Sequence, residues 1–389
     1  MRIAFTGGGT GGHISPIVAT AREIKRIAEE SRILDIELFY FGPEGETPEL
    51  LNNEEIVSSR ISAGKVRRYF SLLNLTDIFK TIIGVFQALW KMFIVMPDVV
   101  FAKGGYGSFP VLLVARLYRI PVIIHASDAI PGVVEKWAGK WARRVAISFS
   151  RAIEFFPEEN TALTGVPLRK GIIGGSEAEA REVIGVLSAR PVLFITGGSQ
   201  GAETINNNVA QILKELNDRY EIIHQTGGQN FEDVFLEATA ILAADRKAAP
   251  GIPGEKFSVI KSIGDHYHLA PFLNESQMRS AYFLADIVIS RAGATSIFEI
   301  AAHAKPAILI PLKDSAQDHQ RANAYEYAER GGATVIETDN LTPSVLLNEI
   351  QKLMADSGKR KAMSEAAQKF ARLDAATTLA EETLKLGLH

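Results

Sequence analysis

Two glycine-rich turns, about half a chain apart, carry residues suited to binding phosphate. The first is Gly7-Gly-Gly-Thr-Gly-Gly-His13, after the apolar run 3–6, and the second is Gly197-Gly-Ser-Gln-Gly201, after the apolar run 192–196. An amphipathic helical pattern follows each. A strand that passes through small residues into a helix exposes the helix N-terminus, where unpaired N–H groups and the positive end of the dipole bind phosphate. The turns therefore predict two phosphate-bearing ligands, one in each half.

Both turns also match other motifs. The first fits G-x-G-x-x-G, but the second strand ends at Phe41-Gly42, where a dinucleotide site would place an acidic residue on the ribose. It is not a Walker loop, because His13 stands where the lysine would be. The second turn fits the G-x-S-x-G of a hydrolase nucleophile elbow. Asp286 and His303 have no context that would complete a triad, so Ser199 is better interpreted as a phosphate ligand.

Two histidines and a carboxylate lie where chemistry is expected. His13 begins the first helix beside the expected phosphate, and His125 ends the apolar strand 121–125. Ligands of parallel sheets bind at the carboxyl ends of the strands. Both histidines, with Asp128 just beyond, are therefore candidates for general-base catalysis, which requires a group within hydrogen-bond reach and a pKa near the working pH.

The densest polar cluster is the segment 290–299, which ends at Glu299. A strand ends at Ser290 and small residues open a helix at Gly293, which predicts a third phosphate site. A carboxylate about two turns into that helix could accept both hydroxyls of a ribose; the alternative is a surface interaction. The polar segment 311–323 follows the next strand and suits the hydroxyls of a sugar, although it could equally be a solvated loop.

Composition limits the function classes. The 389 residues favour two domains, and 47% apolar with 22% charged residues is typical of a soluble globular protein. A net charge of −3 gives no nucleic-acid signal. The chain has no cysteine, which excludes disulfides and thiolate chemistry, and its histidines lack metal-ligand spacing. We expect no metal, no cofactor, no signal peptide and no spanning segment of about 20 apolar residues.

Apolar strands alternate with amphipathic helices, which predicts parallel sheets covered on both faces. Expected strands are 2–6, 36–41, 98–102, 121–125, 144–148, 192–196, 220–224, 258–262, 286–290, 307–311 and 333–337. Expected helices are 16–30, 76–95, 107–118, 132–142, 201–217, 231–242, 276–284, 294–303, 317–329, 343–355 and a final pair within 358–389. We expect a domain boundary near 164–167 and a hinge at 171–177.

The segment 72–96 combines a broad apolar face with nearby lysines and arginines. A buried helix explains the apolar face. An interfacial patch on anionic lipid explains it equally well and also accounts for the basic residues.

The motifs together resemble the MurG family of peptidoglycan N-acetylglucosaminyltransferases. The resemblance rests, in chain order, on 8–13, 104–106, His125, 164–165, Pro167, Arg169, 197–202, 291–295, Glu299, Gln320 and Asn323. It implies an α/β protein of GT-B type, with two Rossmann-like domains whose mainly parallel sheets face across a cleft. Residues 1–167 would bind the acceptor and the membrane, with helix 374–389 packing back on them, and 168–373 would bind the donor.

The implied activity moves N-acetylglucosamine from UDP-N-acetylglucosamine to the muramoyl 4-hydroxyl of lipid I, inverting the anomeric configuration and giving lipid II. The protein would act peripherally at the cytoplasmic face of the inner membrane, on an anionic surface, with other cell-wall synthesis proteins as candidate partners. The alternatives are a related transferase or epimerase of the same fold, and a weak homologue that only binds a UDP-sugar.

The resemblance also assigns residues to each substrate. Donor-binding positions are Arg169, Ser199, Gln200, Gly201, Phe272, Leu273, Ala294, Thr295, Glu299, Gln320 and Asn323. Acceptor-binding positions are Thr10, Gly11, Gly12, Gly104, Gly105 and Tyr106, with His13 as first choice for the base and His125 or Asp128 as alternatives. Four features depart from the family: Ala126 for a usual Glu, Val166 for a usual Asn, Arg321, and a long loop at 243–256.

Overall fold

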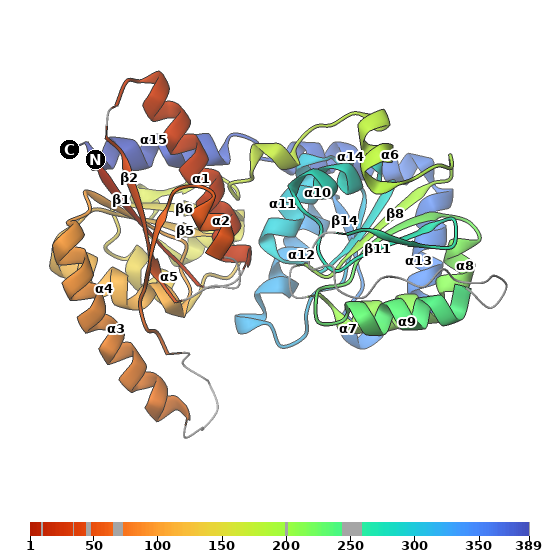
Figure 1. The fold of residues 1–389 in the computed structure, drawn as a ribbon, viewed down its shortest axis with the longest axis horizontal. Coiled ribbons are helices and arrows are strands. Elements are labelled where there is room, and N and C mark those ends of the chain that lie inside the picture. The colour runs from red at the N-terminus through yellow and green to blue at the C-terminus, as the bar shows by residue number, and fades with distance from the viewer. Residues whose placement is uncertain are drawn as a thin grey trace. The chain divides into compact units, whose positions relative to one another are not determined.

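The computed structural model describes residues 1–8, 11–33, 35–43, 48–64, 73–198, 201–242 and 259–388 (Figure 1). The chain divides into two compact units. The first unit comprises Met1–Arg169 together with Arg372–His389, and the second comprises Lys170–Ala371. Each unit holds one twisted, helix-covered sheet, so each is described by itself.

The first unit is built on a seven-stranded parallel sheet with the order β3-β2-β1-β4-β5-β6-β7. Its strands are β1 (Arg2–Thr6), β2 (Glu37–Gly42), β3 (Val57–Arg60), β4 (Val99–Ala102), β5 (Val122–Ala126), β6 (Arg144–Ile147) and β7 (Thr161–Leu163). The strand order reverses between β1 and β4. In open parallel sheets this switch point is where ligands bind, outside the carboxyl ends of the strands.

Helices cover both faces of this sheet. They are α1 (Gly11–Glu30), α2 (Pro48–Asn52), α3 (Leu73–Val95), α4 (Phe109–Leu117), α5 (Val133–Gly139) and, from the far end of the chain, α15 (Ala375–Gly387). Alternate strand residues divide the core: Phe5 and Phe101 pack with α1 and α15, whereas Ala4 and Ala102 pack with α3, α4 and α5. The apolar strands are therefore buried on both faces, as predicted.

Helix α15 returns to the first unit and packs along α1 and β4. Thr377 donates to Glu23 on α1 at 2.9 Å, and Glu382 pairs with Arg144 on β6 at 3.1 Å. Its apolar side adds Leu379 to the core between α1 and the sheet. The last helix is thus an integral layer of the first unit.

The second unit repeats the scheme with the order β10-β11-β9-β8-β12-β13-β14. Its strands are β8 (Val192–Thr196), β9 (Glu221–Gln225), β10 (Lys261–Ile263), β11 (Tyr267–Ala270), β12 (Ile287–Ser290), β13 (Ala307–Leu309) and β14 (Ala333–Val335). Its helices are α6 (Glu177–Ile184), α7 (Glu203–Gln211), α8 (Leu213–Asn217), α9 (Phe231–Leu242), α10 (Glu275–Leu284), α11 (Ala294–Ala302), α12 (His319–Glu329), α13 (Pro343–Ala355) and α14 (Ser357–Phe370). All strand pairs are parallel except β10–β11.

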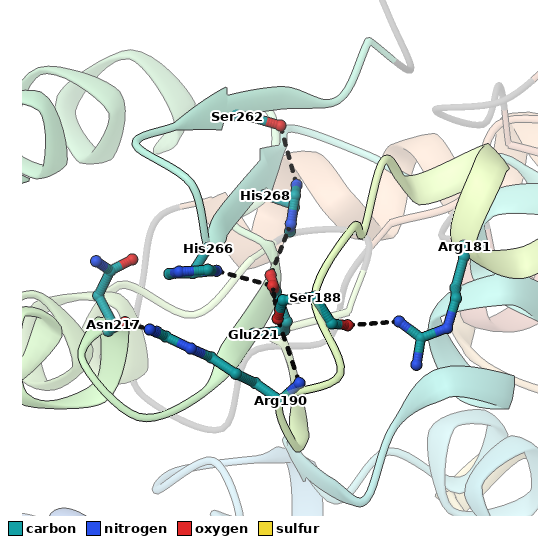
Figure 2. Close-up of polar contacts among 8 residues, drawn as sticks. All are labelled: Arg181, Ser188, Arg190, Asn217, Glu221, Ser262, His266 and His268. Atoms are coloured by element: carbon teal, nitrogen blue, oxygen red, sulfur yellow. Dashed lines mark hydrogen bonds and ion pairs between the residues drawn. The ribbon is translucent and has the colours of Figure 1, made fainter.

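A buried carboxylate ties the amino ends of β9 and β11 together (Figure 2). Glu221 is fully buried and accepts hydrogen bonds from Ser188 Oγ (2.5 Å), His266 Nδ1 (2.8 Å) and His268 Nε2 (3.0 Å). Ser262 Oγ on β10 lies 2.9 Å from His268 Nδ1. Burial raises the pKa of Glu221, but the hydrogen bonds from the serine and both histidines outweigh burial and leave that pKa lowered. The cluster fixes the β10–β11 hairpin to the parallel sheet.

Helix α3 lies along the outside of the first unit beside α4 (Figure 1). One side is docked: Gln87 Oε1 accepts from Ser62 N at 2.8 Å, Lys91 Nζ donates to Arg60 O at 2.7 Å, and Met92 is buried. The opposite side carries large apolar residues that are 47–68% exposed; we call it the α3 apolar face: Ile78, Phe79, Ile82, Ile83, Phe86, Trp90, Phe93 and Ile94.

Within the described residues, the stretch Thr76–Val95 of α3 is long and apolar enough to cross a membrane by length and composition. The sequence predicted no such segment because charged and polar residues interrupt the run. The docked side explains two of these residues: Gln87 accepts from Ser62 N just after β3, and Lys91 donates to the carbonyl of Arg60, the last residue of β3.

The structure confirms most predicted elements and corrects others. It adds β3, β7, α2 and α6, and it divides the predicted helix 201–217 into α7 and α8 at Ile212. The predicted strand 258–262 is wrong in extent: β10 begins at Lys261, and the strand parallel to β9 is β11, which the sequence analysis missed. The segment predicted as a hinge, 171–177, leads directly into α6.

Candidate active site

The carboxyl edge of β1 presents the first glycine turn to the N-terminus of α1. Gly11 and Gly12 form the first turn of α1, and a Cβ added at Gly12 would meet nothing within 4 Å. Gly8 N–H donates to His13 Nδ1 at 2.7 Å. Because Nδ1 accepts this bond, the neutral imidazole carries its proton on Nε2. In this geometry His13 is a hydrogen-bond donor through Nε2–H, which suits a phosphate oxygen.

The turn after β4 packs directly against the first glycine turn. Gly104 and Gly105 have φ values of 82° and 79°, which favour glycine. A Cβ added at Gly105 would lie 2.7 Å from His13 Cε1, and one added at Gly104 would lie 2.2 Å from Glu135 Oε1. Tyr106, which is half-buried, then begins the short 3-10 turn Tyr106–Ser108 before α4. The structure therefore brings Gly105, a predicted acceptor residue after β4, against Gly8 and His13 of the turn after β1.

His125 ends β5, the next strand along the same edge, and is fully buried. Its Nε2 lies 3.0 Å from Gly165 O and 3.1 Å from Ser148 Oγ, so Nε2 carries the proton that a carbonyl oxygen requires. Burial lowers the pKa of His125 well below its ordinary value, and the Lys103 ammonium lowers it further. Asp128, three residues on, is half-buried.

Sequence reasoning missed Lys103, the residue between β4 and its glycine pair. Its side chain is only 1% exposed, and among the described residues Nζ has no hydrogen-bond partner. Burial lowers the pKa of Lys103, while the carboxylates of Asp128 and Glu135 act against that shift. The sequence did contain a signal for Lys103: it is a charged residue directly after an apolar strand, and it precedes Gly104 and Gly105, which were predicted to bind the acceptor.

The second sheet offers the same arrangement at the switch point between β8 and β12. Gly198 and Gly201 have φ values of 78° and 75°. A Cβ added at Gly201 would lie 2.3 Å from Thr226 O, so only glycine fits there. The turn is held by Gln225 Nε2, which donates to Gly198 O at 3.1 Å. Helix α7 begins two residues after Gly201, which leaves its N-terminus at this edge.

The turn after β12 opens α11 at Ala294 and Thr295, with Gly293 as the N-cap. Glu299 lies on this helix, is 7% exposed, and accepts a hydrogen bond from Tyr282 OH at 3.1 Å. That bond fixes the orientation of its carboxylate. Arg291 directly follows β12, but its side chain is buried, and its Nη1 donates to Ile310 O at 3.2 Å.

The other predicted donor residues lie on neighbouring turns of this edge. Gln320 is half-buried near the start of α12, and its Oε1 accepts from Leu312 N at 3.0 Å. Asn323 is fully buried and its Nδ2 donates to Ala292 O at 3.2 Å, which braces the turn before α11. After β11, Phe272 is half-buried, and Leu273 N donates to Gln225 Oε1 at 3.2 Å.

Three predicted residues, Thr10, Ser199 and Gln200, lie outside the described residues. The whole of the long loop 243–256 does too, as do the basic residues of the segment 65–68. Arg169 is half-buried at the end of the first unit. Among the residues that the structure describes, no group of three or more His, Cys, Asp or Glu side chains could hold a metal ion.

Comparisons with known proteins identify the family. Residues 3–147 match the glycosyltransferase family 28 N-terminal domain, and residues 192–379 match the corresponding C-terminal domain. The UDP-N-acetylglucosamine–N-acetylmuramyl-(pentapeptide) pyrophosphoryl-undecaprenol N-acetylglucosamine transferase of Clostridium kluyveri is 36% identical over 354 residues, covering 90% of this chain and 91% of the relative. The crystal structure of Acinetobacter baumannii MurG is 25% identical, with a TM-score of 0.70 and 99% of both chains covered. The chain belongs to the MurG family.

A wider set of proteins shares the fold of the MurG family. The UDP-GlcNAc 2-epimerase of Neisseria meningitidis, solved with UDP-GlcNAc bound, has a TM-score of 0.64 over 99% of this chain and 100% of its own. At 12% identity this likeness shows the fold alone. The fold prediction, two Rossmann-like α/β domains with mainly parallel sheets, is confirmed by both sheets and by these structures.

The departures from the family pattern have local explanations in the structure. Ala126 and Val166 are fully buried, so the apolar side chain at each position packs in the core. Arg321 pairs with Glu337 at 2.9 Å on the exposed side of α12. In this conformation Arg321 is therefore engaged within its own unit.

Proposed function

We propose that this protein is an inverting glycosyltransferase that moves N-acetylglucosamine from UDP-N-acetylglucosamine to the muramoyl 4-hydroxyl of lipid I, giving lipid II. The observation that carries the proposal is the pair of matched sheet edges. Each sheet brings a glycine turn and a helix N-terminus to its switch point, and the second adds a buried, oriented carboxylate at Glu299. The name of the Clostridium kluyveri relative describes an N-acetylglucosamine transferase acting between UDP-N-acetylglucosamine and N-acetylmuramyl-(pentapeptide) pyrophosphoryl-undecaprenol.

The second unit is proposed to bind the donor. Glu299, oriented by Tyr282, would accept the ribose hydroxyls, and the base would lie near Phe272 and Leu273. The diphosphate would lie against the N-termini of α7 and α11, where backbone N–H groups and helix dipoles stabilise negative charge. That charge grows as UDP leaves, so this electrostatic stabilisation is expected to be a large part of catalysis. Gln320 is proposed to contact the sugar.

The first unit is proposed to bind the acceptor, with its diphosphate at the first glycine turn and Gly104-Gly105. The acceptor oxygen attacks the anomeric carbon while the bond from that carbon to UDP breaks and its electron pair leaves on the phosphate. Among the candidate bases, the geometry favours Asp128. His13 Nδ1 already accepts from Gly8, and His125 is fully buried with a lowered pKa. Asp128 is half-buried, so it is more accessible than His125.

A radiolabelled transfer assay tests the function. The purified protein is incubated with labelled UDP-N-acetylglucosamine and a lipid I analogue, and we expect label in the lipid product. Hydrolysis or epimerisation of the donor would instead support a related enzyme of the same fold. Donor binding without turnover would support a weak homologue. Asp128→Asn is expected to lower kcat by at least about 100-fold, the usual contribution of a general base; a rate within a few-fold of wild type would reject Asp128 as the base.

We also propose that the protein attaches peripherally to the cytoplasmic face of the inner membrane through the α3 apolar face. Phe86 and Trp90 are 67% and 68% exposed, which is unusual for large apolar side chains gathered on one helix side. The opposite side of α3 is fixed to the first unit by Gln87 and Lys91. A helix docked along its length with one bare apolar side is suited to lying in the membrane interface.

Vesicle co-sedimentation tests this attachment. Wild type should pellet with vesicles that contain anionic lipid, and Phe86→Glu and Trp90→Glu should remain in the supernatant. Leu187→Glu is the matched control, because Leu187 is 97% exposed but lies in the second unit. Equal pelleting of all four proteins would count against the proposal.

A further inference from the structure

Lys103 is held rigidly at the carboxyl edge of β4 with an ammonium that the described residues leave without a hydrogen bond. Its backbone N–H donates to Thr6 O at 2.8 Å, which continues the β1–β4 ladder by one residue. Its Cβ would lie 3.2 Å from a Cβ added at Gly7. Buried lysines are nearly always paired, because removing an ammonium from water is costly. The buried Lys103 side chain, whose ammonium has no hydrogen-bond partner among the described residues, therefore needs an explanation.

His125 is the neighbour of Lys103 on the same face of the sheet. The register pairs Ala102 with Ile124, so the next residues of the two strands, Lys103 and His125, lie side by side. His125 Nδ1 also lacks a hydrogen-bond partner among the described residues. Since Nε2–H is committed to Gly165 O, Nδ1 is an acceptor. A second proton on this ring would place two buried cations next to each other.

Three titratable groups interact electrostatically with Lys103: His125 from β5, Asp128 from the turn after β5, and Glu135 from α5. His13 lies close by, because its Cβ and that of Lys103 both border Gly7. Glu135 Oε2 accepts from Gly132 N–H and so caps the first turn of α5. Asp128 is half-buried whereas Glu135 is only 7% exposed, so Asp128 is the more accessible of the two acidic residues.

We propose that Lys103 is a positioning residue for glycosyl transfer: its buried ammonium, fixed beside His125 at the carboxyl edge of β4, supplies the positive charge against which Asp128 takes the acceptor proton. This inference rests on the proposed function. As the acceptor oxygen bonds to the anomeric carbon, its proton passes to the Asp128 carboxylate and UDP leaves with the electron pair of the broken bond. Lys103 touches neither substrate and acts through the charge of Asp128.

The test is the pH dependence of kcat/KM in Lys103→Met, which keeps the length of the stem and removes the charge. An opposite charge at close range lowers a carboxyl pKa by about 1–3 units. We therefore expect the acid limb of the profile to move up by about one pH unit or more, with KM for UDP-N-acetylglucosamine unchanged. Lys305→Met is the matched control, because Lys305 is a partly buried lysine of the second unit that donates to Phe283 O. Its acid limb should stay at the wild-type pH.

A double-mutant cycle separates this inference from the proposed function. Unfolding free energies of wild type, Lys103→Met, Asp128→Asn and the double variant give the coupling between the two side chains without any turnover. We expect a coupling of at least about fivefold in the unfolding equilibrium constant at neutral pH. No coupling, or an unmoved acid limb in folded Lys103→Met, overturns the inference. Coupling in a protein that fails to transfer would reject the proposed function alone.

Discussion

Replacing Glu221 by alanine should destabilise the second unit strongly without touching the proposed substrate site. The substitution leaves three donors, Ser188 Oγ, His266 Nδ1 and His268 Nε2, without their common acceptor. Removing one member of a buried charged network typically costs about 3–5 kcal/mol. His266 is 19% exposed and can recover a bond to water, whereas His268 at 2% cannot. We therefore expect about 3–4 kcal/mol.

Urea and thermal unfolding of the full chain measure this loss. For a unit of this size, a loss of that order lowers the transition temperature by roughly 10 °C. Glu232→Ala on α9, where the carboxylate is exposed, is the control and should change stability by less than about 0.5 kcal/mol. Donor binding should be unchanged in both variants, because Glu221 begins β9 and the donor turns follow the other ends of the strands. A loss below about 1 kcal/mol would refute the argument.

The pH dependence follows from the same carboxylate. Because the folded pKa of Glu221 is lowered, its contribution is fully present above the unfolded value near 4.5 and is lost as the pH falls through the folded pKa. Glu221→Gln should remove this part of the acid dependence. A wild-type-like decline in stability below pH 4.5 in Glu221→Gln would contradict the assignment.

Three further predictions concern the two sheet edges. Gly8→Ala would place a Cβ 2.2 Å from His13 Nδ1; displacement of the ring should lower transfer at least about tenfold while calorimetry finds unchanged donor affinity. Tyr282→Phe removes the bond to Glu299, and at about 1 kcal/mol per hydrogen bond the Kd for UDP should rise roughly fivefold. Gly201→Ala places a Cβ 2.3 Å from a backbone carbonyl at φ 75°, so donor binding should fall in titrations while acceptor-analogue binding persists.

The sequence was sufficient to predict a strand or helix wherever its apolar residues form a continuous run or recur at helical spacing. The strands β1, β4, β5, β8 and β12 are mainly apolar on both faces, and the long helices between them have one apolar side. The elements that it missed lack this signal. β3 reads Val-Ser-Ser-Arg and is largely exposed at the sheet edge, so no apolar run marks it. Helix α6 had a local signal, a Ser176 N-cap and Gly185 with φ 86°, whereas the sequence analysis considered only the preceding segment 171–177, as a hinge.

The sequence predicted where the candidate site lies better than it predicted the hydrogen bonding and burial of the residues in it. Glycine turns after apolar strands located both ligand edges, because topology alone brings the carboxyl ends of neighbouring parallel strands together. Which atoms of His13 and His125 are already engaged depends on partners distant in the chain, such as Gly165 O, 40 residues beyond His125. The same holds for Lys103, whose burial is set by α1 and β5. Sequence spacing carries no record of such contacts.

The return of α15 to the first unit makes the order of synthesis matter. The second unit is one continuous stretch, Lys170–Ala371, and every part of it leaves the ribosome before α15 does. The first unit gains the contacts of Thr377, Leu379 and Glu382 only after nearly the whole chain has been synthesised. A nascent chain can therefore complete its second unit while its first unit still lacks the α15 layer, so only chains translated through α15 have both units complete.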